Sequence, residues 1–248
     1  MPDAGRPRAI PLPGALFLMP VAFMTSVVAA VVAGQWALPP LALLPIAMVL
    51  GIALPAVAAA WVSGAEIRAA LGLTAAPPRA LAGAILVGAS FWYVNAAFIA
   101  PWFAGAPSAS DRRLAELVGG ADGLALKIAV IAIVPAVCEE LLVRGAIARG
   151  IAARAGFWVS VVLSSAYFAA MHLSLARAAP TAALGALLAV AALRSGSTIP
   201  AMLIHFLNNA IALTMAATAA VPDPRIAAPV ALAATIGGTA LLWRSHRR

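Results

Sequence analysis

The stretch PAVCEELLVRGAIARG, residues 135–150, places two adjacent glutamates and an arginine inside an apolar run. The rest of the chain avoids charge: of its 248 residues, 64% are hydrophobic and only 10% are charged. Its mean hydropathy is +1.03, whereas soluble proteins contain about 25% charged residues. This composition predicts an all-α, polytopic membrane protein, in which Glu139, Glu140 and Arg144 lie within a membrane-spanning helix.

Apolar runs recur along the whole chain. A spanning helix needs about 20 mostly apolar residues, and a bundle of about eight spans is predicted near residues 10–34, 38–62, 80–102, 124–148, 155–174, 178–194, 197–220 and 226–243. At Pro39, Pro40, Pro55 and Pro180 we expect helices to begin late or to kink. No repeat or linker divides the pattern, so we expect a single membrane domain over residues 1–248, with a motif core at about 124–220.

The net charge of +8 comes from basic residues that lie singly or in pairs near predicted helix ends. This distribution favours the positive-inside rule over nucleic-acid binding. With the N-terminus inside, eleven basic residues, Arg144 among them, lie on the cytoplasmic side and five on the other. We therefore expect both termini in the cytoplasm. The apolar run after Arg6 and Arg8 is longer than the 7–15 residues of a signal core, which predicts a retained anchor.

Two further features concern the setting of the protein. Residues 104–123 form the longest polar connection, which we expect to be a loop or a short surface helix.

The frequent use of alanine, arginine and glycine fits a GC-rich bacterial genome. The predicted location is therefore a bacterial cytoplasmic or inner membrane, with several passes through it.

Polar residues inside the predicted spans are few. All four aspartates lie outside the spans, so the only carboxylates within them are Glu139 and Glu140. Charged groups at the centre of a bilayer cost about 2.5–3.5 kcal/mol or more, and they normally face a bundle interior and mark function. The remaining polar candidates, most of them on the fourth, fifth and seventh spans, are Asn95, Arg144, His172, His205, Asn208 and Asn209.

The spacing of these residues shows which ones share a helix face. Glu140 and Arg144 are separated by four residues, close enough to pair, and Glu139 points about 100° away from them. His205 and Asn209 also share a face. Helix lengths place His172 near the depth of Glu139, but the depth of His205 relative to Glu139 stays open.

Three motifs occur in order on successive predicted spans: EExxxR at 139–144, FxxxH at 168–172 and HxxxN at 205–209. Together they resemble the CAAX prenyl protease and bacteriocin-processing family (CPBP, or Abi), the type II CAAX endopeptidases among glutamate-type intramembrane proteases. The resemblance covers residues 139–209 closely. Asn208, beside Asn209, leaves the register of the third motif ambiguous.

The resemblance implies an intramembrane endopeptidase that needs no cofactor. Glu139 and His172 would activate water, and His205 and Asn209 would bind the oxyanion. The substrate would be a membrane-anchored peptide or a C-terminal tail at the lipid bilayer. Supporting roles would fall to Glu140, Arg144 and Phe168.

Alternative readings also fit the residues. Some protease types lack their motifs here. An aspartyl protease would need two aspartates within the spans, a rhomboid-like protease would need a GxSG-like turn, and the usual zinc protease would need HExxH, and the sequence has none of these. A zinc-dependent version of the same protease stays open, because Glu139, His172 and His205 could supply three ligands with water as the fourth. A transporter or proton relay would also use buried glutamate and histidine. A non-catalytic immunity protein on the same fold is a third alternative.

Overall fold

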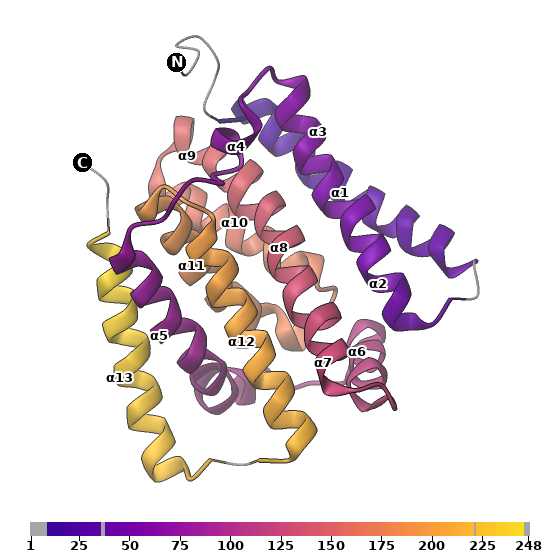
Figure 1. The fold of residues 1–248 in the computed structure, drawn as a ribbon, viewed down its shortest axis with the longest axis vertical. Helices are drawn as coiled ribbons and strands as arrows, with labels where there is room; N and C mark the ends of the chain where they lie inside the picture. The colour runs from indigo at the N-terminus through magenta and orange to yellow at the C-terminus, as the bar shows by residue number, and fades with distance from the viewer. Residues whose placement is uncertain (1–8, 36–37, 221, 246–248) are drawn as a thin grey trace.

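The computed structural model describes residues 9–35, 38–220 and 222–245, and no strand occurs among them. Helices with α-helical, π-helical or 3-10 geometry account for most of this part of the chain (Figure 1). The first half contains α1 Leu12–Gly34, α2 Pro40–Met48, η1 Val49–Ala53, α3 Leu54–Val62, α4 Ile67–Ala70, α5 Pro78–Val94, η2 Asn95–Ile99, η3 Ala100–Phe103 and α6 Ala109–Gly119. The second half contains α7 Leu124–Lys127, η4 Ile128–Ile133, α8 Val134–Glu140, η5 Leu141–Ala148, α9 Arg149–Ala155, α10 Phe157–Met171, α11 Leu175–Ser195, α12 Ile199–Thr218 and α13 Pro224–Trp243.

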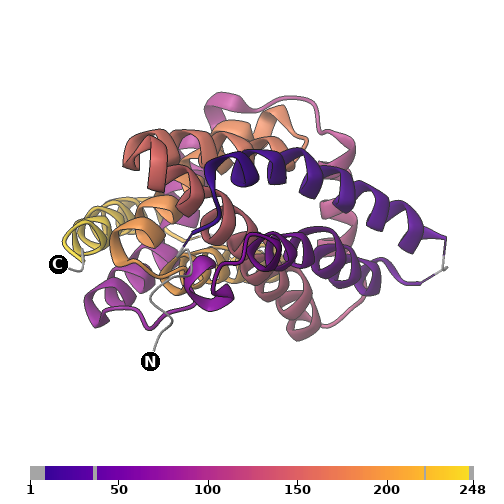
Figure 2. The same ribbon diagram turned by 90° about the horizontal axis from the view of Figure 1, so that it is seen from above.

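The long helices run between the two ends of one bundle. In the described part of the chain, six helical runs are long and apolar enough to cross a membrane: α1, α2–α3, α5–η3, α11, α12 and α13. Seen from above in Figure 2, α1 and the α2–α3 run lie on one side of the bundle, and α5 and α13 pack together on the other. The chain is therefore an all-α, multi-pass membrane protein, as its composition predicts.

Two of the eight predicted spans are not among these six. The fourth is a continuous helical run from Leu124 to Ala155, and it contains the charged residues of the first motif. Gly156 ends this run with a φ of 85°, which a residue without a side chain adopts readily. The fifth, α10, has only 15 residues. The total of eight spans remains a prediction.

Proline residues shape the helices in a regular way. Pro40 lies at the start of α2, as expected, and Pro180 lies within α11. Pro55 lies two residues after the π-helical segment η1. In the same way, Pro101 follows η2 and Pro135 follows η4. Because proline has no N–H, it leaves a carbonyl one turn earlier without its usual partner, and a wider helix relieves the clash with the ring. Near Pro55, the carbonyl of Gly51 instead accepts a hydrogen bond of 2.7 Å from the hydroxyl of Thr25 on α1.

Several basic residues predicted on the cytoplasmic side meet at one end of the bundle. Arg79 and Arg194 donate hydrogen bonds to the backbone carbonyls of Arg244 and Trp243 at the end of α13. Arg149 donates to a carbonyl of α4. These contacts hold together the start of α5 and the ends of α11 and α13, which the prediction places on one side.

The charge count itself needs a correction. Arg144 is fully buried in the bundle, where it pairs with Glu140 one turn away. It therefore does not belong among the basic residues at the membrane surface. Ten basic residues then remain on the predicted cytoplasmic side, still twice the five on the other. Four residues in this count, Arg6, Arg8, Arg247 and Arg248, lie outside the described part of the chain.

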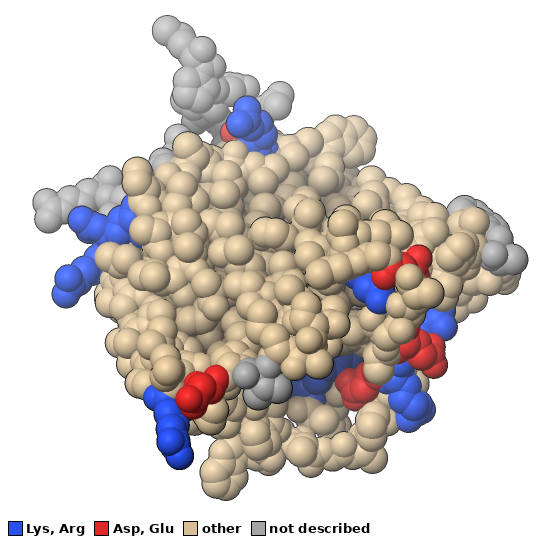
Figure 3. Space-filling view, turned by 60° about the horizontal axis from the view of Figure 1, so that its bottom comes forward, with Lys and Arg blue, Asp and Glu red and all other residues tan. Residues whose placement is uncertain are grey.

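The polar connection at 104–123 contains the short helix α6, which confirms the alternative of a surface helix. Ser108 and Asp111 form a capping box at its start. At its other end, the ammonium group of Lys127 donates hydrogen bonds of 2.6 Å to the carbonyls of Val118 and Gly120. In Figure 3, charged side chains of both signs are most frequent toward the right of the view and recur at the lower left, and the surface between them is uncharged.

Candidate functional site

A cavity of about 740 Å³, called here the site cavity, lies among α1, α2, α6, α8, α10, α11 and α12. Its wall is mostly apolar, with a few polar groups that converge from different helices, as is typical of a small-molecule or peptide site. The polar residues of the three motifs that line it are Glu139, His172, His205, Asn208 and Asn209. The cavity thus joins residues that lie up to 70 positions apart in the sequence.

Glu140 is the centre of a buried polar network. One of its carboxylate oxygens accepts a hydrogen bond of 3.0 Å from Arg144 and lies 2.9 Å from Nδ1 of His205. Arg144 donates a second hydrogen bond of 3.0 Å to the carbonyl of Gly185 on α11. Glu140 and Arg144 therefore form the ion pair that their spacing predicts. The contact from Glu140 to His205 adds a connection between α8 and α12.

Glu139 is held differently from its neighbour. Its side chain is buried and lines the site cavity, which that of Glu140 does not. Each of the two glutamates has one buried oxygen, Oε2, without a hydrogen-bond partner. Nε2 of His205 lies 3.9 Å from Oε2 of Glu139, too far for a hydrogen bond. A buried carboxylate oxygen without a partner is costly for stability, and a carboxylate that also lines a cavity is typical of a group kept for binding or chemistry.

His172 lies just past the end of α10, where it caps the helix. Its Nδ1 is 2.8 Å from the carbonyl oxygen of Phe168. Because a carbonyl only accepts hydrogen bonds, Nδ1 must carry the hydrogen in this contact. The other ring nitrogen, Nε2, then has its lone pair free when the ring is neutral. Since His172 lines the site cavity, this nitrogen can accept a proton there.

Phe168 contacts the other motif residues with its ring. The guanidinium carbon of Arg144 lies 4.3 Å from the ring centre, in cation–π contact. The rings of His172 and His205 meet it edge-on at 5.0 and 5.6 Å between centres. Phe168 is 1% exposed, so it acts as a fixed surface against which three of the motif side chains pack.

Asn208 and Asn209 both line the site cavity. The amide nitrogen of Asn208 donates a hydrogen bond of 3.1 Å to the amide oxygen of Asn209. With its oxygen engaged in this way, Asn209 has its NH₂ group available to donate into the cavity. Asn208 is the more buried of the two, and its own amide oxygen has no partner.

Other residues at the cavity are absent from the three motifs. Asn95, at the start of η2, lines the cavity and donates to the carbonyl of Pro180, while its own oxygen lacks a partner. The sequence already marks Asn95 as a candidate, because it is an isolated amide side chain on an apolar predicted span. Arg113 of α6 and Arg177 of α11 also line the cavity. No local pattern predicts this, because α6 reaches the cavity only through the folded chain.

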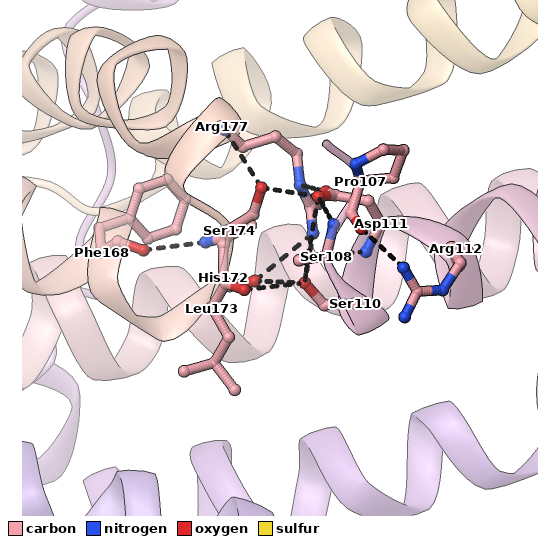
Figure 4. Close-up of polar contacts among 10 residues, drawn as sticks. All are labelled: Pro107, Ser108, Ser110, Asp111, Arg112, Phe168, His172, Leu173, Ser174 and Arg177. Carbon is pink, nitrogen blue, oxygen red and sulfur yellow. Dashed lines mark hydrogen bonds and ion pairs between the residues drawn. The ribbon is translucent and has the colours of Figure 1, made fainter. Parts of the chain in front are cut away.

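The contacts of α6 with this region are shown in Figure 4. Ser110 donates a hydrogen bond of 2.7 Å to the carbonyl of His172. Asp111 forms an ion pair with Arg177 and accepts a hydrogen bond of 2.8 Å from Ser174. Burial by itself would raise the pKa of the Asp111 carboxyl, but the hydrogen bonds from Ser108 and Ser174 and the charge of Arg177 hold it well below its usual range. Asp111 is therefore ionised at neutral pH.

The ligand set of the zinc alternative can be compared with this geometry. Among the described residues, no group of three or more histidine, cysteine, aspartate or glutamate side chains is arranged to hold a metal ion. Glu139 and His205 approach each other, whereas the Nδ1 side of His172 is turned to the carbonyl of Phe168. These three residues surround one cavity without forming a ligand cluster.

Comparison with known families gives one match. Residues 121–211 fit the family described as type II CAAX prenyl endopeptidase Rce1-like. No curated protein and no solved structure matches the chain. The matched residues include all three motifs and run from the start of the fourth helical run into α12. Over residues 121–211, the chain is therefore similar to the Rce1-like family of type II CAAX prenyl endopeptidases.

Proposed function

We propose that this protein is an intramembrane endopeptidase that hydrolyses a peptide bond in a membrane-anchored or C-terminal-tail substrate. Glu139 and His172 activate the attacking water, and His205 and Asn209 bind the oxyanion. The observation that carries the proposal is that Glu139, whose Oε2 has no hydrogen-bond partner, lines one cavity together with both histidines and the asparagine pair. The family match supports proteolysis as the reaction.

The chemistry divides into two proton transfers. Water adds to the substrate carbonyl carbon while Glu139, assisted by Nε2 of His172, takes its proton. The proton then passes to the amide nitrogen as the C–N bond breaks, which leaves a carboxylic acid and an amine. General-base catalysis of this kind contributes about 10²–10⁴-fold to the rate.

The negative charge on the carbonyl oxygen needs donors during this reaction. In the proposed mechanism, Nε2 of His205 and the NH₂ group of Asn209 donate to it. Glu140, 2.9 Å from Nδ1 of His205, balances the charge of the ring when both nitrogens carry hydrogen. The Glu140–Arg144 pair thus keeps His205 oriented without contacting the substrate.

The location and the lining of the cavity limit which kind of peptide can bind. The protein is embedded in a bilayer, and the cavity wall is mostly apolar, so an extended apolar peptide segment fits better than a soluble charged one. We place the protein in the cytoplasmic or inner membrane of a bacterium, with both termini in the cytoplasm. Whether the peptide is prenylated is part of the test.

Membranes from cells that express either wild type or Glu139→Gln provide the direct test. The membrane peptides of both strains are compared by mass spectrometry, and an uncut precursor should accumulate only with Glu139→Gln. That peptide, made with and without a prenyl group, is then incubated with purified protein in lipid vesicles. Equal peptide patterns in the two strains, or transport of the peptide without cleavage, would contradict the proposal.

The metal-free mechanism predicts resistance to chelators. Activity of the purified protein should survive exhaustive dialysis against a strong chelator, and elemental analysis should find well under one zinc per chain, because Glu139 and His172 suffice to activate water. Stoichiometric zinc, together with activity that is lost on dialysis and restored by zinc, would establish the zinc-dependent mechanism instead.

The two asparagines should differ in their effect on cleavage. Asn209→Ala removes an oxyanion donor, so we expect the cleavage rate to fall by about 10²–10³-fold. Asn208→Ala should cost much less, because Asn208 acts only through its hydrogen bond to Asn209. The measurement is kcat for both variants, with thermal stability as the control for folding. A larger loss with Asn208→Ala in a well-folded protein would show that the register of the third motif is wrong.

A further inference from the structure

The turn between α10 and α11 contains His172 and is bonded to the surface helix α6. Ser110 donates hydrogen bonds to the carbonyls of both His172 and Leu173, at 2.7 and 3.4 Å. Arg177 donates to the hydroxyl of Ser110 at 3.0 Å and to the carbonyl of His172 at 3.4 Å. The backbone of His172 is therefore held by two side chains from outside its own helix.

Asp111 connects these groups into one unit, the Asp111 cluster, which consists of Ser108, Ser110, Asp111, Ser174 and Arg177. Its carboxylate accepts from Ser174, and the hydroxyl of Ser174 in turn accepts from the backbone N–H of Arg177 at the start of α11. Asp111 thus contacts both the cap of α11 and the arginine that reaches His172.

The turn held in this way is strained. Leu173 has a φ of 50°, in the left-handed region that residues with side chains seldom adopt. Its side chain is 60% exposed, so its own packing does not explain the conformation. Such strain persists only where the surroundings enforce it. The hydrogen bond from Ser110 to the carbonyl of Leu173 is one enforcing contact.

Helix α6 is itself fastened at both ends. Its start is bound through Asp111, and its end through the two hydrogen bonds from Lys127 to Val118 and Gly120. Lys127 is buried and lies in the first turn of the helical run that continues to Glu139. A helix fastened in this way is a fixed support for the turn, in contrast to a lid that opens and closes.

We propose that the Asp111 cluster is a positioning device for His172: it fixes the strained turn after α10 so that the free ring nitrogen faces the site cavity. This inference rests on the proposed role of His172 in water activation. Ser110 and Arg177 line the site cavity, but Asp111 itself does not, and the hydrogen bonds of the cluster to His172 end on its backbone carbonyl. The cluster therefore acts on His172 through its backbone. Loss of the cluster therefore lowers kcat and leaves KM nearly unchanged.

Two variants test the inference. Asp111→Asn keeps the shape of the side chain but removes the ion pair with Arg177, and Ser110→Ala removes one hydroxyl that donates to His172. In Asp111→Asn we expect kcat to fall by about 10- to 100-fold, as for a small misplacement of a catalytic group, with KM changed by less than about threefold. Ser110→Ala should shift kcat in the same direction by a smaller factor.

Glu116→Gln is the matched control. It makes the same carboxylate-to-amide change on the same helix, in an exposed pair with Arg113 that does not contact the turn. Its kcat and KM should equal those of wild type. An equal loss of kcat in Glu116→Gln, or a rise in KM alone in Asp111→Asn, would overturn the inference.

Hydrogen–deuterium exchange separates this inference from the proposed function. The amides of residues 172–177 should exchange faster in Asp111→Asn than in wild type or Glu116→Gln, because Ser174 and Arg177 lose their common partner. Unchanged exchange would refute the inference whether or not the protein cleaves peptides. If Glu139→Gln kept its activity, the proposed function would fail, and the exchange would still decide whether Asp111 fixes the turn. Faster exchange with normal kcat would show that the turn does not position a catalytic group.

Discussion

Replacing Glu139 by glutamine is expected to lower the rate of peptide cleavage by about 10²–10⁴-fold, the contribution of a general base. The change keeps the size of the side chain and removes its ability to take a proton from water. Because Oε2 of Glu139 has no hydrogen-bond partner, the variant should insert and purify in normal yield. The measurement is the single-turnover rate on the peptide identified from membranes, in lipid vesicles.

Two controls make this result specific. His172→Ala should lose activity to a similar degree, since the two residues act on the same water. Glu116→Gln changes an exposed carboxylate outside the site cavity and should be fully active. Near-normal cleavage by Glu139→Gln would exclude Glu139 as the general base.

Arg144→Ala is expected to reduce stability as well as activity, which distinguishes it from the changes at Glu139. The guanidinium is completely buried and joins Glu140, Gly185 and the ring of Phe168. Its removal leaves the charge of Glu140 without its partner in the bundle interior, which typically costs about 3–5 kcal/mol. The yield of folded protein and the midpoint of thermal unfolding in detergent should both fall.

A double variant shows whether the unpaired charge is the cause. Adding Glu140→Gln to Arg144→Ala removes that charge, so the double variant should unfold at a higher temperature than Arg144→Ala alone. Arg113→Ala, at an exposed arginine, should have little effect on unfolding. If Arg144→Ala were as stable as wild type, the pair with Glu140 would not support the bundle.

Much of the fold was predictable because it follows from local rules. Helix limits depend on apolar runs and on prolines, and the predicted segment 226–243 differs from α13 by only two residues at its start. The pairing of Glu140 with Arg144 follows from helical periodicity alone. The partner that compensates Pro55 is different: the hydrogen bond from Thr25 to Gly51 depends on how α1 packs against the second span, so the sequence of one segment does not reveal it.

The site was predictable in its residues but not in its connections. The motifs identify Glu139, His172 and His205 as candidate site residues. The hydrogen bond between His205 and Glu140, however, depends on how α8 and α12 cross, and helical periodicity does not determine that crossing. The depth of His205, left open by helix lengths, is set by the same crossing. The contact of Asp111 with Arg177 joins residues 66 positions apart and follows only from the position of α6 in the folded chain.

The hydrogen bond between Thr25 and Gly51 bears on the order in which the protein assembles. In hydrocarbon, a carbonyl without a partner costs several kcal/mol, and Pro55 leaves the second span with a defect of this kind. Ribosomes make α1 first, so Thr25 is already in the membrane when Gly51 arrives. The backbone at Gly51 also lies directly against Ser26, where a larger residue would collide. We therefore expect the first two spans to leave the translocon as a preformed hairpin, to which the later helices are added.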